Sequence, residues 1–248
     1  MFIPWAGYFD IMAHSDVFVV LDNVQYTHAD WRNRNRIKTA DSWIWFTVPV
    51  HARGRLEKHI NEIEIDYGTD WKEKHLASLE HSYKRAPFFD EVMDIMVRAY
   101  GADHALLVEL NMDLMRQIMR YISLDTKVLM ASEMASSGAK TERLISLLED
   151  VGADRYLSGR AASSYLDEKM LLEAGIEVEW HDYAHPYYDQ LWLKRQGFIS
   201  HLSVIDLMFN HGPDSLEIIT RHKLIEKPGW VKISDANEMG SMTARGAQ

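Results

Sequence analysis

The stretch RYLSGRAASSYLDEKMLLEAGIEVEWHDY, residues 155–183, decides the fold class. Its apolar pattern predicts a strand over 155–159, a helix over 167–175 and a second strand over 177–183. A glycine after the last periodic residue is a common end for a helix, and here it is Gly175. Strand and helix in alternation favour an α/β protein with a mostly parallel, Rossmann-like sheet flanked by helices.

The rest of the chain repeats these patterns. Short apolar or alternating runs predict strands over 17–22, 43–50, 60–65 and 127–132. Apolar residues three and four apart predict helices over 71–86, 88–100, 103–122, 139–151, 201–212 and 213–222.

The helices between about residues 71 and 122 interrupt the alternation, and we interpret them as a helical insertion. The segment after Lys227 lacks an apolar period and is rich in small residues. We therefore expect one α/β domain over 1–225 and a flexible C-terminal tail over 226–248.

Composition excludes several classes of protein. The 248 residues carry a net charge of −10, which argues against a general nucleic-acid binder, because such proteins bind phosphates through clustered Lys and Arg. Cysteine is absent, so disulfides and thiolate chemistry are excluded. No apolar run is long enough to span a membrane, and the N-terminus does not have the pattern of a signal peptide, so we expect a cytoplasmic location. Twelve His carry no HExxH motif, and no metal site is predicted.

Two N-terminal stretches contain candidate site residues. In FIPWAGYFD (2–10), Gly7 would let the backbone approach a phosphate ahead of a helix over 11–16; the alternative is an aromatic-rich turn that packs on the core. In LDNVQY (21–26), Asp22 ends an apolar strand, where ligand-binding carboxylates commonly project; the alternative is a turn-forming Asp-Asn pair.

The stretch WRNRNRI (31–37) is the most unusual feature of an acidic chain. In an extended conformation, Arg32, Arg34 and Arg36 share one face, and Trp31 and the asparagines share the other. Arginine holds phosphate or carboxylate through paired hydrogen bonds, and asparagine binds hydroxyls or base edges. We favour an anionic ligand here; the alternative is a solvated loop with local ion pairs.

The C-terminal half offers a third group of candidates. Ser158 and Gly159 end a strand, and Ser164 enters the following helix, so backbone N–H groups there would form a cradle for an anion. Asp206 and Asn210 lie one turn apart on an otherwise apolar helix. Buried polar groups need partners, which are either a ligand or neighbouring residues of the protein.

These segments, in this order, resemble the WbqC-like proteins of bacterial O-antigen and surface-polysaccharide gene clusters. The resemblance is carried by FIPWAGYFD, SDVFVVLDNVQY, WRNRNRI, FTVPV, YLSGRAASSYL and LSVIDLMFNHG, and it extends over about residues 1–222. It places Asn33, Arg34, Asn35 and Arg36 on the family's motif and Arg32 at a variable position, so we expect Arg32 on the surface.

The resemblance implies an enzyme that acts on a nucleotide-activated or phosphorylated sugar, with a group transfer as the reaction. In this hypothesis Arg34 and Arg36 bind the diphosphate, Asp22 is the general base or ribose ligand, and Tyr8 and Tyr165 orient the substrate. No cofactor is implied beyond the nucleotide-linked substrate, and the oligomeric state stays open. The alternative is a non-catalytic binding or assembly protein whose Arg-Asn cluster holds an anionic partner.

Overall fold

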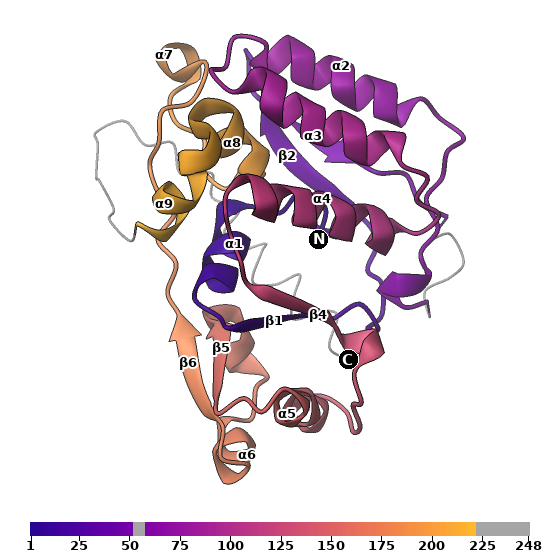
Figure 1. The fold of residues 1–248 in the computed structure, drawn as a ribbon, viewed down its shortest axis with the longest axis vertical. Coiled ribbons are helices and arrows are strands. Elements are labelled where there is room, and N and C mark those ends of the chain that lie inside the picture. Colours follow the sequence, from indigo (N-terminus) through magenta and orange to yellow (C-terminus); the bar gives the residue numbers. More distant parts are fainter. Residues whose placement is uncertain (52–57, 222–248) are drawn as a thin grey trace. The chain divides into compact units, whose positions relative to one another are not determined.

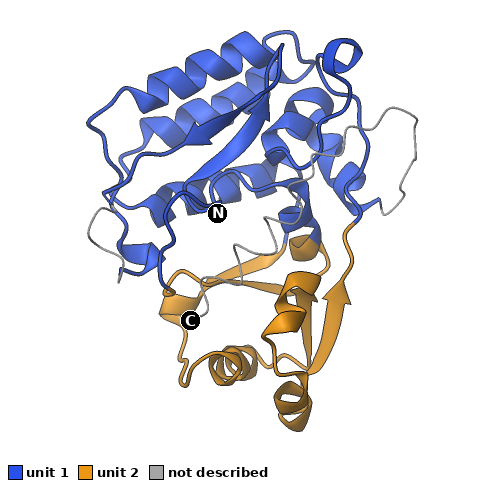
Figure 2. Ribbon diagram, turned by 180° about the vertical axis from the view of Figure 1, so that it is seen from behind, with its two compact units in different colours: residues 1–10, 25–125, 184–233 blue, residues 11–24, 126–183, 234–248 orange. Residues whose placement is uncertain are grey.

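The computed structural model describes residues 1–51 and 58–221, and these form two compact units (Figures 1 and 2). The first unit contains residues 1–10, 25–125 and the described chain from 184 onward. The second contains residues 11–24 and 126–183. The predicted tail over 226–248 lies outside the described residues.

The first unit is built from one hairpin and a set of helices. Strands β2 (Arg34–Lys38) and β3 (Trp43–Thr47) pair in antiparallel register. Helix α1 (Ala6–Ala13) begins in this unit. The other helical elements are η1 (Ile60–Glu62), α2 (Trp71–Tyr83), α3 (Phe89–Gly101), α4 (Leu107–Tyr121), α7 (Leu193–Gln196), α8 (Val204–His211), η4 (Gly212–Asp214) and α9 (Ser215–Thr220).

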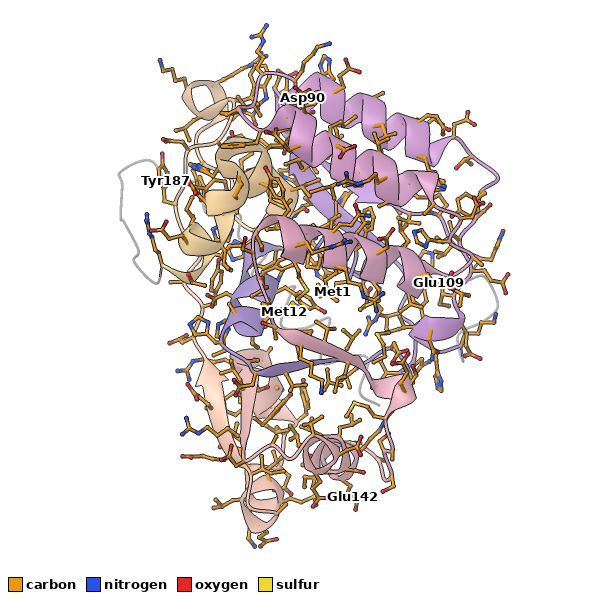
Figure 3. All side chains as sticks on the ribbon, in the orientation of Figure 1. Met1, Met12, Asp90, Glu109, Glu142 and Tyr187 are labelled. Carbon is orange, nitrogen blue, oxygen red and sulfur yellow. The ribbon has the colours of Figure 1, made fainter. Side chains whose placement is uncertain are left out.

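The three helices of the predicted insertion are present within the first unit, where α3 packs between α2 and α4 (Figure 1). Their apolar residues recur every three or four positions, and in α3 the buried set is Val92, Ile95, Met96, Ala99 and Tyr100. The acidic residues Asp90 and Glu109, labelled in Figure 3, lie in the first turns of α3 and α4, where the helix dipole favours negative charge.

The second unit contains two parallel strand pairs. Strand β1 (Val17–Val20) pairs with β4 (Lys127–Met130), and β5 (Arg155–Gly159) pairs with β6 (Glu177–His181). A small core of Leu148, Leu171 and Ile176 forms between helices and the β5–β6 pair. The helical elements of this unit are η2 (Ala131–Glu133), α5 (Thr141–Asp150), η3 (Arg160–Ser164) and α6 (Glu168–Glu173).

The structure confirms a mixture of helices and strands with short parallel sheets flanked by helices. In the part of the chain that the structure describes, however, the strands form three two-stranded sheets rather than one continuous Rossmann-like sheet. The βαβ pattern that residues 155–183 predict is present as β5, α6 and β6.

Two predicted elements differ from the structure. INEIEI (60–65), predicted as a strand, forms the short helix η1 and isolated bridges, because the His59 N–H donates to the Glu62 carboxylate at 2.7 Å and closes a turn. The helix expected over 11–16 begins earlier, at Ala6, so Gly7 and Tyr8 lie inside its first turn.

A buried polar network joins β2 to α2 and α8. Asp206 on α8 is fully buried, and its carboxylate accepts hydrogen bonds from the hydroxyls of Tyr83 and Tyr188, at 2.7 and 2.9 Å, and from Gln190 Nε2 at 2.9 Å. The same Tyr83 oxygen accepts the backbone N–H of Lys38 at 2.9 Å, and Lys38 Nζ donates to Gln190 Oε1 at 2.9 Å. Every group in this network therefore has a partner, as buried polar groups require.

Asp206 and Lys38, at the two ends of this network, also interact through their opposite charges. Burial raises the pKa of Asp206, whereas the tyrosine hydroxyls and the Lys38 charge lower it. Burial likewise lowers the pKa of Lys38, and the charge of Asp206 opposes that shift. Each residue thus stabilises the other in an environment that penalises both charges.

Asp206→Ala is expected to reduce the free energy of unfolding by about 3–5 kcal/mol, because it leaves Lys38 buried without its counter-charge. Urea denaturation at neutral pH measures this change. The exposed residue Asp125 provides a control, and Asp125→Ala should change stability by less than about 0.5 kcal/mol. Equal effects of the two substitutions would contradict a structural role for the network.

Candidate functional site

The β2–β3 hairpin separates an apolar face from a face of arginines and tryptophans. Asn35 and Ile37 of β2 and Phe46 of β3 are buried in the core. Successive side chains of a strand point to opposite faces, so Arg34 and Arg36 lie on the other side of β2. There Arg36 pairs with Trp45 across the hairpin, and Arg34 pairs with Thr47.

The arginines on this face pack against indole rings. The Arg34 guanidinium carbon lies 4.2 Å from the centre of the Trp45 ring. That of Arg36 lies 5.1 Å from Trp43, 5.5 Å from Trp31 and 5.7 Å from Trp45. We call Arg34, Arg36, Trp31, Trp43 and Trp45 the Arg–Trp ladder. A cation over an indole face is attracted by about 0.5–2 kcal/mol, so these contacts fix the arginine orientations.

An extended WRNRNRI stretch would place Trp31 on the face opposite the arginines. In the structure Trp31 instead lies on the same side as Arg36, whose guanidinium carbon is 5.5 Å from its ring centre. The strand begins only at Arg34, and residues 31–33 form a turn. Because the strand alternation does not apply within a turn, the Trp31 ring reaches Trp45, with ring centres 5.4 Å apart.

The two asparagines of the motif bind backbone. Asn33 Nδ2 donates to Val48 O at 3.0 Å. Asn35 Nδ2 donates to Ile3 O at 2.8 Å, and its Oδ1 accepts the Arg36 N–H at 2.8 Å. The Asn35 bond joins β2 to the N-terminal segment, the Asn33 bond joins the start of β2 to the chain just after β3, and together they restrain Arg34 between them.

A cavity of about 540 Å³ opens beside this motif in the first unit. Arg34 and Asn33 belong to its wall, and two atoms of these residues, Arg34 Nε and Asn33 Oδ1, are buried without a hydrogen-bond partner among the described residues. Buried polar atoms of this kind are uncommon in folded proteins, and an ordered water, an ion or a ligand is the usual partner. The lining residues are His28, Ala29, Asn33, Arg34, Thr47, Pro49, Val50, His51 and Asp66.

Sequence patterns did not identify several of these groups. His51 Nε2 lies 3.9 Å from Asp66 Oδ1 at the wall of the cavity. Tyr26 carries a buried hydroxyl without a partner among the described residues. Burial raises the pKa of Tyr26 to about 12, and the charges of Arg32 and Arg34 oppose the shift. Tyr26 is the last residue of the LDNVQY block, and no other sequence pattern pointed to it as a site residue.

Arg32 differs from its predicted surface position. Its side chain is 28% exposed and forms a salt bridge with Asp30. Burial lowers the pKa of the Arg32 guanidinium. The Arg32 carbonyl also accepts a hydrogen bond from Asn111 Nδ2 at 2.8 Å, so this arginine fixes the turn that precedes β2.

Gly7 and Tyr8 lie on α1. A side chain at Gly7 would overlap the Trp5 indole, so the structure explains this glycine by close packing on an aromatic ring. The Tyr8 N–H donates to Trp5 O at 3.0 Å. Burial raises the pKa of the Tyr8 hydroxyl well above its usual range.

Asp206 and Asn210, predicted to contact either a ligand or the protein, make hydrogen bonds within the protein. Those of Asp206 belong to the buried network described above. Asn210 Nδ2 donates to Asp206 O at 2.6 Å, and its Oδ1 accepts the Leu191 N–H at 2.9 Å. This geometry favours hydrogen bonding within the protein over contact with a ligand for both residues.

The remaining predicted site residues belong to the second unit. Asp22 is 2% exposed, and its carboxylate accepts hydrogen bonds from the Ser132 N–H at 2.9 Å and the Ser132 hydroxyl at 2.6 Å. These bonds join the ends of β1 and β4. The other candidates lie at the end of β5 and just beyond it, and they are Ser158, Gly159, Ser164 and Tyr165.

These last candidates make few contacts. Ser164 Oγ donates to Ala161 O at 3.3 Å, as is usual for a local turn. Tyr165 is 51% exposed, and a side chain added at Gly159 would meet open space. Gly159 and Tyr165 are therefore accessible near the end of β5, whereas Ser158 is buried, with 4% exposure.

The chain matches the model of the WbqC-like protein family over residues 1–218. It is also 41% identical over 216 residues to the uncharacterized protein Rv1507c of Mycobacterium tuberculosis, an alignment that covers 86% of this chain and 92% of that protein. The chain therefore belongs to the WbqC-like protein family. No solved structure matches it. Among the described residues, no helix is long and apolar enough to cross a membrane.

Two buried histidines of the first unit are held neutral. His75 stacks on Phe46 with ring centres 4.2 Å apart, and burial lowers its pKa to about 4. His185 accepts the His201 N–H at Nε2, and burial lowers its pKa to about 3, with a further contribution from the charge of His201. In the unfolded chain both would titrate near pH 6.5.

Acidification is expected to destabilise the first unit, because the unfolded chain binds protons that the buried imidazoles exclude. The free energy of unfolding should be highest above pH 6.5 and fall from there towards pH 4, by about 1–2 kcal/mol for each histidine at pH 5. Denaturant midpoints at pH 7 and pH 5 measure the loss. His185→Gln should reduce it, whereas substitution of the exposed His81 should not. A wild type of equal stability at both pH values would contradict this prediction.

Proposed function

We propose that the cavity at Arg34 binds the phosphate or diphosphate of a nucleotide-activated or phosphorylated sugar, and that the protein is an enzyme of surface-polysaccharide (O-antigen) biosynthesis that transfers a group. The observation that carries the proposal is Arg34, which lines a cavity of about 540 Å³ and whose buried Nε has no hydrogen-bond partner in the described chain. Cavities of about 300–1,000 Å³ are typical of small-molecule sites.

Arginine suits this role for two reasons. Its guanidinium stays charged at all physiological pH values, and its planar fork matches the oxygens of phosphate. Trp45 also restrains the Arg34 side chain, since the guanidinium carbon lies 4.2 Å from the ring centre. A donor that is already oriented loses little entropy on binding, which favours affinity.

The rest of the cavity supplies groups suited to a sugar. Thr47 and Asn33 offer hydroxyl and amide atoms, and His51 and Asp66 offer groups that exchange protons. Polar groups of this kind hydrogen-bond sugar hydroxyls, whereas Arg34 is the group that attracts negative charge.

The roles predicted for residues outside this cavity stay predictions. They are a general base or ribose ligand at Asp22, and substrate-orienting hydroxyls at Tyr8 and Tyr165. The anion-binding role of Arg36 is also a prediction, because the residue is only 5% exposed and its guanidinium packs among the tryptophans of the ladder.

The alternative, a protein that holds an acidic segment of a partner, gains less support. Protein partners bury roughly 800 Å² per side on broad surfaces, whereas small ligands occupy concave sites. Arg34 and Asn33, each with one buried polar atom that lacks a partner in the described chain, line a concave site. A small anionic ligand therefore fits the geometry better.

Arg34→Ala is expected to weaken binding of a nucleotide sugar about 10- to 100-fold, because hydrogen bonds to charged groups contribute about 1.5–3 kcal/mol. Isothermal titration calorimetry with pyrophosphate and with a nucleoside diphosphate sugar measures the loss. Arg34→Lys should retain part of the affinity, since it keeps the charge and loses the fork. Arg98 on α3, exposed and paired with Asp94, supplies the control substitution Arg98→Ala.

The proposal is overturned if folded wild-type protein binds neither pyrophosphate, nor any nucleotide, nor any sugar phosphate. It is equally overturned if Arg34→Ala binds these ligands as well as Arg98→Ala does. Binding to a partner protein without any small-molecule ligand would support the alternative.

A further inference from the structure

The Arg–Trp ladder continues from the cavity along the hairpin. Arg34 belongs to both, because it lines the cavity and lies over Trp45. Trp45 in turn lies 5.4 Å from Trp31 and 5.6 Å from Trp43, measured between ring centres. A ligand anchored at Arg34 would thus have indole rings next to its charged group.

Part of the ladder is accessible. Trp45 is 37% exposed, and Trp31 and Trp43 are partly exposed, although tryptophan is a residue that folding normally buries. Cross-strand contacts between arginine and tryptophan stabilise a hairpin whether or not a ligand binds. Such contacts do not account for an exposed indole beside a guanidinium that lacks a partner at Nε.

The chemistry of the ladder distinguishes between two kinds of ring. The C–H groups of a sugar carry partial positive charge and stack on the negative face of an indole, but here the positive charge of the Arg34 guanidinium lies next to the Trp45 ring and disfavours them. A nucleobase is planar and stacks on both aromatic rings and guanidinium planes. The ladder therefore favours a nucleobase over a sugar ring.

We propose that the Arg–Trp ladder is a base-stacking subsite, in which Trp45 and the Arg34 guanidinium hold the base of a nucleotide whose diphosphate occupies the adjoining cavity. This proposal rests on the proposed function and makes it specific. The substrate is a nucleoside diphosphate derivative rather than a simple sugar phosphate.

The test compares three ligands by isothermal titration calorimetry on the full chain, namely pyrophosphate, uridine diphosphate and glucose 1-phosphate. Uridine diphosphate should bind about 5- to 100-fold more tightly than pyrophosphate, the gain that stacking of one base on an aromatic side chain provides. Trp45→Leu should abolish this ratio, and Trp45→Phe should retain much of it. Trp180, a partly exposed tryptophan in β6 of the second unit, provides the matched control Trp180→Leu, which should leave the ratio unchanged.

A second measurement does not depend on the folding of a variant. Uridine diphosphate should quench wild-type tryptophan fluorescence at concentrations at which pyrophosphate does not. The proposal is overturned if the two ligands bind equally, if Trp45→Leu preserves the ratio, or if neither ligand changes the fluorescence.

Two further outcomes separate this proposal from the one on which it rests. If glucose 1-phosphate gains the larger advantage over pyrophosphate and Trp45→Leu removes it, the ladder stacks a sugar, and the base-stacking proposal is wrong while the anion site stands. If none of the three ligands binds, the anion site itself is wrong, and the subsite falls with it.

Discussion

The buried carboxylate of Asp206 is the interaction on which the first unit depends. It lies on α8, yet through Tyr83, Gln190 and Lys38 it fixes the end of β2. A strand of five residues in a two-stranded sheet has little stability of its own, because such sheets are marginal in water. The network supplies the restraint that the small sheet lacks, and it does so at a position where an unpaired charge would be costly.

This restraint also positions the candidate site. Lys38 ends the strand that carries Arg34 and Arg36, and Asn35 binds backbone between them. With both ends of β2 fixed, Arg34 packs against the Trp45 indole and lines the cavity. A site held on a rigid strand binds with better defined geometry than one on a loop. The packing of the first unit and the geometry of the candidate site therefore both depend on the placement of β2.

The sequence predicted those features that depend on residues near one another in the chain. The apolar runs at β1 and β3, the helices of residues 71–122 and the family motif at Arg34 all have local signals. Other features depend on residues that meet only in the folded chain, such as Asp206 with Tyr83, 123 positions away. Neither the periodicity nor the composition of the sequence can predict such pairs. For this reason His51, Asp66 and Tyr26 were not identified beforehand, and the helical start at Ala6 was missed because aromatic residues with a glycine suggest a turn.

A crystal soaked in selenate shows whether the Arg34 cavity binds an anion, because selenium has an anomalous signal and selenate has the shape and charge of phosphate. We expect an anomalous peak inside the cavity within hydrogen-bonding distance of the Arg34 guanidinium, and we expect a nucleoside diphosphate to displace it. Peaks found only elsewhere on the protein, in crystals where the cavity is open to solvent, would contradict this expectation.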